Sequence, residues 1–184
     1  MAAVRAGMED LIDLVERLID DGDNTHHSKE DIQEALDQHR QEARYVDVTP
    51  VKSIAEGGAV TYLTYTAPRG LTHWEATGSL LDYNYAALTP SSSDWMAGRW
   101  TFSSEPTRPV RLLGFTFDVY MAAADLLDVR ASMLSEDLQS FSGQGGAFTL
   151  AAKSPSLRSQ AKAYRAKARV QSIDLIRDDV NVLM

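Results

Sequence analysis

The chain has 184 residues, which is enough for one domain with a hydrophobic core and too few for two of ordinary size. Its hydrophobic content of 44% and charged content of 24% are typical of a folded protein, so extensive disorder is not expected. The net charge of -8 argues against general binding to nucleic acid, because phosphate backbones select for lysine and arginine.

Neither secretion nor membrane insertion is expected. No run of apolar residues approaches the roughly 20 needed to cross a bilayer. Met1 to Arg17 carries acids where a signal peptide would be basic. Because the chain has no cysteine, it can form neither a disulfide nor a thiolate metal site.

Two helices are predicted at the amino-terminal end. The first covers Val4 to Ile19, where apolar residues spaced three and four apart form a stripe, and the turn residues Asp21 to Asn24 end it. The second begins at Ser28 and continues to His39. Ser28 and Asp31 have the spacing of a capping box, in which each side chain accepts a hydrogen bond from the other residue's amide.

Between residues 45 and 113 the pattern changes to alternation, with many β-branched and aromatic residues. We expect a small antiparallel sheet that includes a hairpin with its turn at Glu56-Gly57-Gly58. The segment Pro90 to Asp94 is typical of a turn. Further short strands are expected at Thr72–Thr77, Asn84–Leu88, Arg99–Phe102 and Val110–Leu113.

Two more helices are predicted after the sheet. A long one covers about Asp118 to Leu138, and its alanines at 122–124 permit close packing by another helix. Phe141 to Gly146 is a glycine-rich loop that we expect to become ordered only in an assembly. Ser154-Pro155 predicts the start of the last helix, since serine is a good N-cap and proline suits the first helical position. The narrow apolar stripe of that helix consists of Leu157, Ala161, Tyr164 and Ala168.

These elements predict an α+β fold, a bundle of about four helices with a small antiparallel sheet inserted between the second helix and the long central helix. Residues 1–170 would form a single domain, helical over 1–44, a sheet over 45–113 and helical over 114–170. Residues 171–184 would form a docking arm, because so apolar a terminus is expected to bury itself against a partner. Its apolar residues are Ile173, Leu175, Ile176, Val180, Val182 and Leu183.

Charge is distributed unevenly along the chain. Met1 to Asp47 holds thirteen acids against five bases, whereas Leu157 to Arg169 holds five bases and no acid. A protein polarised in this way can pair head to tail with copies of itself. Contact with a partner and simple solvation are both open for this basic helix, and contact with DNA is less favoured than either. Its candidate interface residues are Arg158, Lys162 and Arg165.

No motif indicates catalysis, and we expect no enzymatic activity, no cofactor and no metal. His26, His27 and His39 could ligate a metal, but adjacent histidines beside a turn are usually solvated. The acids of the first helix fit a solvated face better than a catalytic carboxylate pair. Gly143 to Gly146 lacks the Lys-Ser/Thr that a phosphate loop requires. Aromatic residues of the predicted strands fit a core better than a ligand surface; they are Trp74, Trp95, Trp100, Tyr62, Tyr65, Tyr83 and Tyr85.

The segment Gly114 to Asp128, GFTFDVYMAAADLLD, resembles the signature of the head-to-tail connector proteins of long-tailed bacteriophages, also called adaptor or head completion proteins. In that family a glycine and an aromatic residue precede Asp-Val-Tyr, an alanine run and Asp-Leu-Leu, which open the central helix. Phe141 to Leu150 is similar to the family's Phe-Ser-x-x-Gly-x-x-Phe loop, and Ser159 to Arg169 resembles its last helix. Met8 to Arg44 is similar more weakly. Ala151 to Pro155 departs from the family, in which a Ser-Gln-Lys run leads straight into the last helix.

The resemblance implies a structural virion protein, made in the host cytoplasm and located in the neck between capsid and tail. Such adaptors form a homo-oligomeric ring, commonly a dodecamer, that binds the portal protein and extends the channel of the packaged genome towards a stopper or tail protein. DNA passes through without sequence-specific binding. The arm from Ile173 to Leu183 would insert against the portal. A neck stopper or tail-terminator subunit is the alternative, and a monomeric ligand-binding or hydrolytic domain is a further one.

Overall fold

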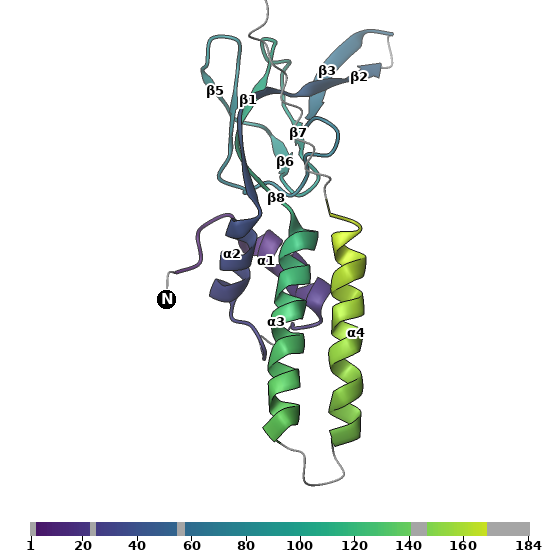
Figure 1. The fold of residues 1–184 in the computed structure, drawn as a ribbon. Helices are drawn as coiled ribbons and strands as arrows, with labels where there is room; N and C mark the ends of the chain where they lie inside the picture. The colour runs from purple at the N-terminus through teal and green to yellow at the C-terminus, as the bar shows by residue number, and fades with distance from the viewer. Residues whose placement is uncertain (1–2, 23–24, 55–57, 141–146, 169–184) are drawn as a thin grey trace, which may run out of the picture.

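The computed structural model describes residues 3–22, 25–54, 58–140 and 147–168. These residues form four helices and two small antiparallel sheets, so the predicted mixed α+β class is confirmed. The helices gather at one end and the sheets at the other, which gives an elongated molecule (Figure 1). None of the helices in the described ranges combines the length and apolar character needed to cross a membrane.

The first two helices end where the sequence predicts, and the second also begins there. The predicted start of the first helix at Val4 is wrong, because Gly7 has a φ of 82° that an α-helix cannot accommodate. Helix α1, Glu9–Ile19, ends at Asp20, which adopts a left-handed conformation with a φ of 54°. Helix α2, Lys29–Gln38, begins with the predicted capping box. The backbone N–H of Asp31 donates to Ser28 Oγ at 3.2 Å, and the Ser28 N–H donates to the Asp31 carboxylate at 2.9 Å. Local side chains therefore fix where α2 starts.

The described strands form two sheets, whereas the sequence predicted one. The first sheet has the order β1-β8-β4-β5 and the second has the order β2-β3-β7-β6. All pairs are antiparallel, as predicted. The strands are β1 Arg40–Asp47, β2 Thr49–Ile54, β3 Val60–Thr66, β4 Ser79–Leu81, β5 Ala87–Leu88, β6 Ser92–Asp94, β7 Arg99–Thr101 and β8 Arg111–Phe117.

The strand predictions succeeded in part. The hairpin of β2 and β3 is confirmed, and positions 55–57 of its turn lie outside the described residues. The predicted strand Thr72–Thr77 is wrong, because this segment holds only an isolated bridge between Trp74 and Thr116. The predicted turn at Pro90 to Asp94 contains strand β6, whose three residues are all exposed. A strand without a buried side chain has no apolar alternation from which to predict it.

Helices α3, Val119–Ser140, and α4, Ala147–Arg165, run side by side (Figure 1). The alanines at 122–124 are fully buried, so α3 does pack closely against its neighbours. Asp118 caps α3 by accepting hydrogen bonds from the amides of Tyr120 and Met121.

The predicted start of the last helix at Ser154-Pro155 is wrong. Helix α4 begins at Ala147 and continues through Pro155. The Ser154 hydroxyl is buried and donates to the carbonyl of Ala131 in α3 at 3.0 Å, instead of capping a helix. Packing against α3 therefore outweighs the hydrogen bond that proline cannot make.

Two hydrophobic clusters match the two ends of the molecule. One joins all four helices and includes Leu11, Leu36, Leu127 and Ala161. The other belongs to the sheet end and includes Trp74, Trp100 and Tyr65. The predicted core role of the aromatic residues is confirmed for these three, which are 0–1% exposed, and is wrong for Tyr83 and Tyr85, which are both 58% exposed.

Candidate functional site

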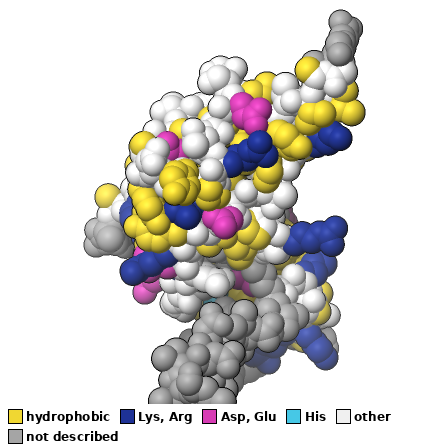
Figure 2. All heavy atoms as spheres, turned by 90° about the horizontal axis from the view of Figure 1, so that it is seen from above, with side chains coloured by type: hydrophobic (Ala, Val, Ile, Leu, Met, Phe, Trp, Pro, Cys, Tyr) yellow, Lys and Arg dark blue, Asp and Glu magenta, His cyan; other side chains and the backbone are white. Residues whose placement is uncertain are grey.

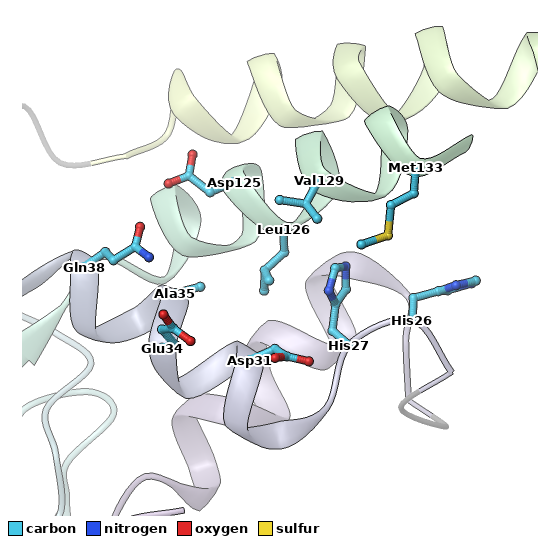
Figure 3. Close-up of a pocket in the computed structure, with 10 residues that line it drawn as sticks. All are labelled: His26, His27, Asp31, Glu34, Ala35, Gln38, Asp125, Leu126, Val129 and Met133. Atoms are coloured by element: carbon cyan, nitrogen blue, oxygen red, sulfur yellow. The ribbon is translucent and has the colours of Figure 1, made fainter. Parts of the chain in front are cut away.

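A groove between α2 and α3 is the candidate binding site of the helical end (Figure 3). It encloses about 280 Å³, and its apolar part consists of Ala35 from α2 with Leu126, Val129 and Met133 from α3. Val129 is 45% exposed and Met133 is 54% exposed. We call this feature the α2–α3 groove. Its exposed apolar side chains suit contact with another surface better than contact with water.

Acidic side chains border the α2–α3 groove. Asp31 and Glu34 project from the exposed side of α2, and Asp125 comes from α3. Hydrogen bonds from Ser28 lower the pKa of Asp31 below its usual value. Asp31 therefore carries a negative charge at neutral pH. Glu34 forms no ion pair with another residue that the structure describes.

His27 places an unsatisfied polar atom in this groove. Its side chain points from the loop before α2 towards α3 (Figure 3), and the residue is 4% exposed. The backbone N–H donates to Asp21 at 2.9 Å, whereas Nε2 has no hydrogen-bond partner among the described residues. Burial lowers the pKa of His27, so the imidazole is neutral at pH 7. An unpartnered buried polar atom costs on the order of 1–3 kcal/mol of stability.

Asp125 connects three helices at the other end of the groove. Its carboxylate lies 2.7 Å from His39 Nε2, at the end of α2, and 2.8 Å from the Arg165 guanidinium of α4. Burial opposes ionisation of Asp125, but the hydrogen bonds from His39 and Arg165 outweigh it and keep the pKa of Asp125 below its usual value. His39, considered above as a metal ligand, is thus part of a hydrogen-bond network with Asp125.

Arg165 has its charge partners within the chain. Its second nitrogen lies 2.7 Å from the Asp128 carboxylate, and hydrogen bonds to Asp125 and Asp128 raise the pKa of Arg165. The Arg165 side chain is 41% exposed and could still contact a partner, but the carboxylates of Asp125 and Asp128 already neutralise its charge.

Arg158 and Lys162 form an unpaired basic face on α4. They lie four residues apart, both are exposed, and neither has an ion pair within the described part of the chain. An adjoining side of α4 is anchored: Ala161 is buried, and the Tyr164 hydroxyl donates to the carbonyl of Leu18 at 2.8 Å. We call Arg158 and Lys162 the basic face. It is directed away from the molecule's own core.

The other predicted interface residues cannot be placed. Ile173, Leu175, Ile176, Val180, Val182 and Leu183 lie outside the described residues, as does the Phe141 to Gly146 loop. Within the described ranges, no three histidine or acidic side chains are grouped so as to hold a metal ion.

The comparisons with known proteins identify no relative. No family model, no curated protein and no solved structure matches this chain significantly. The resemblance of Gly114 to Asp128 to the connector signature therefore stands on the residues themselves.

The sheet end carries a second exposed apolar surface. Figure 2 views this end and shows hydrophobic side chains among basic and polar ones, with β2 and β3 forming an arm that extends from the body. Tyr83 and Tyr85 are both 58% exposed, and the guanidinium of Arg111 lies 4.8 Å from the Tyr85 ring centroid. On the arm, Ile54 is 65% exposed and Val60 is 44% exposed. Both ends of the molecule thus present surfaces suited to protein contact.

The α2–α3 groove was not predicted from the sequence. Met133 follows the apolar spacing of the long helix, and this pattern does not distinguish a buried residue from one that borders a groove. Helix α2 has 10 residues and α3 has 22, so α2 covers only part of the length of α3. The apolar side chains of Val129 and Met133 on α3 therefore stay exposed. The acids of α2 and the ridge are far apart in the sequence, and no local pattern connects them.

Proposed function

We propose that this protein is a head-to-tail adaptor subunit of a long-tailed bacteriophage. It forms a homo-oligomeric ring, commonly of twelve subunits, that binds the portal and extends the DNA channel towards the tail. Its role in the virion neck is mechanical and requires no active site. The observation that carries the proposal is an elongated molecule that exposes contact surfaces beside its helices and at its sheet end, because a ring subunit must contact its neighbouring copies and also the protein to which the ring binds.

The residues of the connector-like segment support the proposal. Gly114 to Phe117 complete strand β8, Asp118 caps the central helix, and the alanines at 122–124 lie in the helical core. The segment therefore joins the sheet end to the helical end. In the proposed family the same motif opens the central helix.

The chain path supports the proposed arrangement, in which the sheets are inserted between α2 and the long central helix. The chain leaves the helical end at Arg40 and returns at Phe117, and these two residues are paired across β1 and β8. The helices before and after the insertion share one hydrophobic cluster. We assign residues 1–170 to a single adaptor domain and residues 171–184 to the arm that docks on the portal.

Electron microscopy of the purified protein tests this function, alone and mixed with the portal protein of the same phage. We expect closed rings at high concentration and rings stacked on the portal when the two are mixed. A protein that stays monomeric at high concentration and does not bind the portal would refute the proposal. A monomer whose melting temperature rises with a small ligand would favour the ligand-binding alternative.

The size of the sheet end favours one other candidate, a neck stopper or tail-terminator subunit. Two four-stranded sheets occupy this end, more than the single small sheet expected for an adaptor. Such a subunit would bind a tail protein or an adaptor ring but would not bind the portal directly. A pull-down with isolated portal rings distinguishes the two functions.

A further inference from the structure

We infer that the α2–α3 groove of one copy receives the basic face of α4 from the neighbouring copy. This inference rests on the proposed ring and names the surfaces that would close it. The groove supplies Asp31, Glu34 and an apolar floor, and α4 supplies Arg158 and Lys162. The occupant is thus a second copy of this chain.

The two surfaces belong to different helices of the subunit. α2 and α4 both pack on α3, one on each side (Figure 1), so the groove opens beside α2 while the basic face belongs to the opposite neighbour of α3. An interface between two different patches of the same chain joins copies head to tail, and it makes a ring when the rotation closes. The same patches on one flank would instead favour a closed dimer.

Charge and spacing match between the two surfaces. Asp31 and Glu34 lie three residues apart on α2, and Arg158 and Lys162 lie four residues apart on α4. Both spacings are close to one helical turn of about 5.4 Å, so two helices lying side by side can form two ion pairs. Opposite charges on facing patches also suppress wrong partners.

The groove and α4 also match in their uncharged groups. Ser159 and Ala163 are small exposed residues of α4, next to the row of Arg158 and Lys162, and they let the helix approach closely. Val129 and Met133 would then be covered. The buried, unpartnered imidazole is an observation independent of the acidic border.

The chain's own carboxyl-terminal segment fits the groove less well. Residues 169–184 carry three acids, Asp174, Asp178 and Asp179, against two arginines. Apolar residues of this segment could reach an apolar floor, but its net negative charge opposes binding beside Asp31 and Glu34. The basic face is positively charged and is therefore attracted to these acids.

Charge reversal tests the inference in the full-length protein. We expect Glu34→Lys and Lys162→Glu each to weaken self-association by about tenfold or more, measured by sedimentation velocity, because each places like charges together. Asp10→Lys on α1 and Lys52→Glu on β2 change the charge equally at exposed positions outside the two surfaces, and they should leave association unchanged. Circular dichroism and melting curves verify that each variant folds.

Two combinations of these substitutions should restore assembly, and they test whether Glu34 and Lys162 contact each other. The double variant Glu34→Lys/Lys162→Glu should associate like the wild type, because the ion pair is only reversed. A mixture of the two single variants should also form rings, since every interface of an alternating ring is then complementary. Failure of both restorations, with folded variants, would overturn the inference.

Cross-linking identifies the occupant directly, because the chain has no cysteine of its own. With Glu34→Cys and Lys162→Cys in one chain, a short bismaleimide should give a ladder of covalent oligomers. The cysteine pair Glu34→Cys and Leu183→Cys tests whether the carboxyl-terminal segment occupies the groove instead. Cross-links only in this second pair would assign the groove to that segment and refute the inference.

The outcomes for the function and for the interface are distinguishable. Wild-type rings that form equally well with Glu34→Lys and Lys162→Glu would refute the interface and leave the adaptor function standing. A wild-type protein that neither self-associates nor binds the portal would refute the adaptor function, and the interface with it.

Discussion

The imidazole of His27 is buried without a hydrogen-bond partner at Nε2, and it lines the α2–α3 groove. Its amide is satisfied by Asp21, its ring is buried, and its Nε2 has no partner among the described residues. Burial lowers the pKa of His27, and the nearby carboxylates of Asp21 and Asp31 only partly oppose this. A residue with these properties lowers the stability of the folded subunit.

His27 should make the isolated protein less stable in acid. Because its folded-state pKa lies below the ordinary value of 6.5, the unfolded chain binds more protons, and the free energy of unfolding falls as the pH drops through that value. We expect His27→Leu to lose this part of the pH dependence, measured by urea unfolding between pH 7.5 and 5.5. His26→Leu, at an exposed position, is the control. An unchanged pH dependence in His27→Leu would show that the imidazole is already protonated or solvated.

At the scale of elements, α2 and α4 illustrate opposite relations between local sequence and structure. The capping box of Ser28 and Asp31 is complete within four residues, and the helix starts where it predicts. Ser154-Pro155 carries an equally good local start, but α4 continues through it because Ser154 is bound to α3. Local chemistry decides a helix end only where no neighbouring element competes.

Removing the cap of α2 should lower stability. Ser28→Ala leaves the amide of Asp31 without its acceptor, and we expect the free energy of unfolding to fall by about 1 kcal/mol. Urea unfolding at neutral pH measures this change. Ser156→Ala, at an exposed position within α4, should change stability much less. Equal effects of the two substitutions would contradict the capping role.

Replacing Pro155 tests whether α4 is continuous. Within a helix, alanine restores a backbone donor, so Pro155→Ala should stabilise the protein by about 1–3 kcal/mol. Pro106→Ala, in a loop, should destabilise the protein, because alanine only increases the conformational entropy of the unfolded chain. Destabilisation by Pro155→Ala would instead indicate a helix that starts at Ser154. Thermal melting of both variants measures the difference.

At the scale of the whole molecule, helices and sheets form two ends with separate hydrophobic clusters, joined through β1 and β8. Unpaired surfaces of opposite charge flank α3, and exposed tyrosines and the β2–β3 arm lie at the other end. This distribution suits the proposed ring subunit, which would bind its copies beside α3 and another protein at its sheet end.

Association between copies should depend on salt. Raising NaCl from 0.1 M to 1 M shortens the Debye length from about 10 Å to about 3 Å and screens exposed ion pairs. We therefore expect the association constant to fall, as measured by sedimentation. The double variant Glu34→Lys/Lys162→Glu should show the same dependence, since it keeps the pairs with reversed sign. Stronger association at high salt would indicate a mainly apolar interface.

Of the two surfaces in the candidate site, only the basic face could be predicted from the sequence. The basic face could be identified because Arg158 and Lys162 lie in a run without acids. The groove could not, because it combines Asp31 and Glu34 with Val129 and Met133 across a long separation in the sequence. Arg165 was predicted as free for a partner, yet two carboxylates of α3 neutralise it.

The amino-acid sequence alone determined the mixed α+β class, the capping box of α2, the β2–β3 hairpin and the amphipathic faces of the helices. Each depends on hydrogen bonds or apolar spacing within a few residues. Only the tertiary structure decided the division of the strands into two sheets, the continuity of α4 through Pro155 and the groove beside α2. These depend on which distant segments meet, because a strand pair or a groove exists only when both of its sides are brought together.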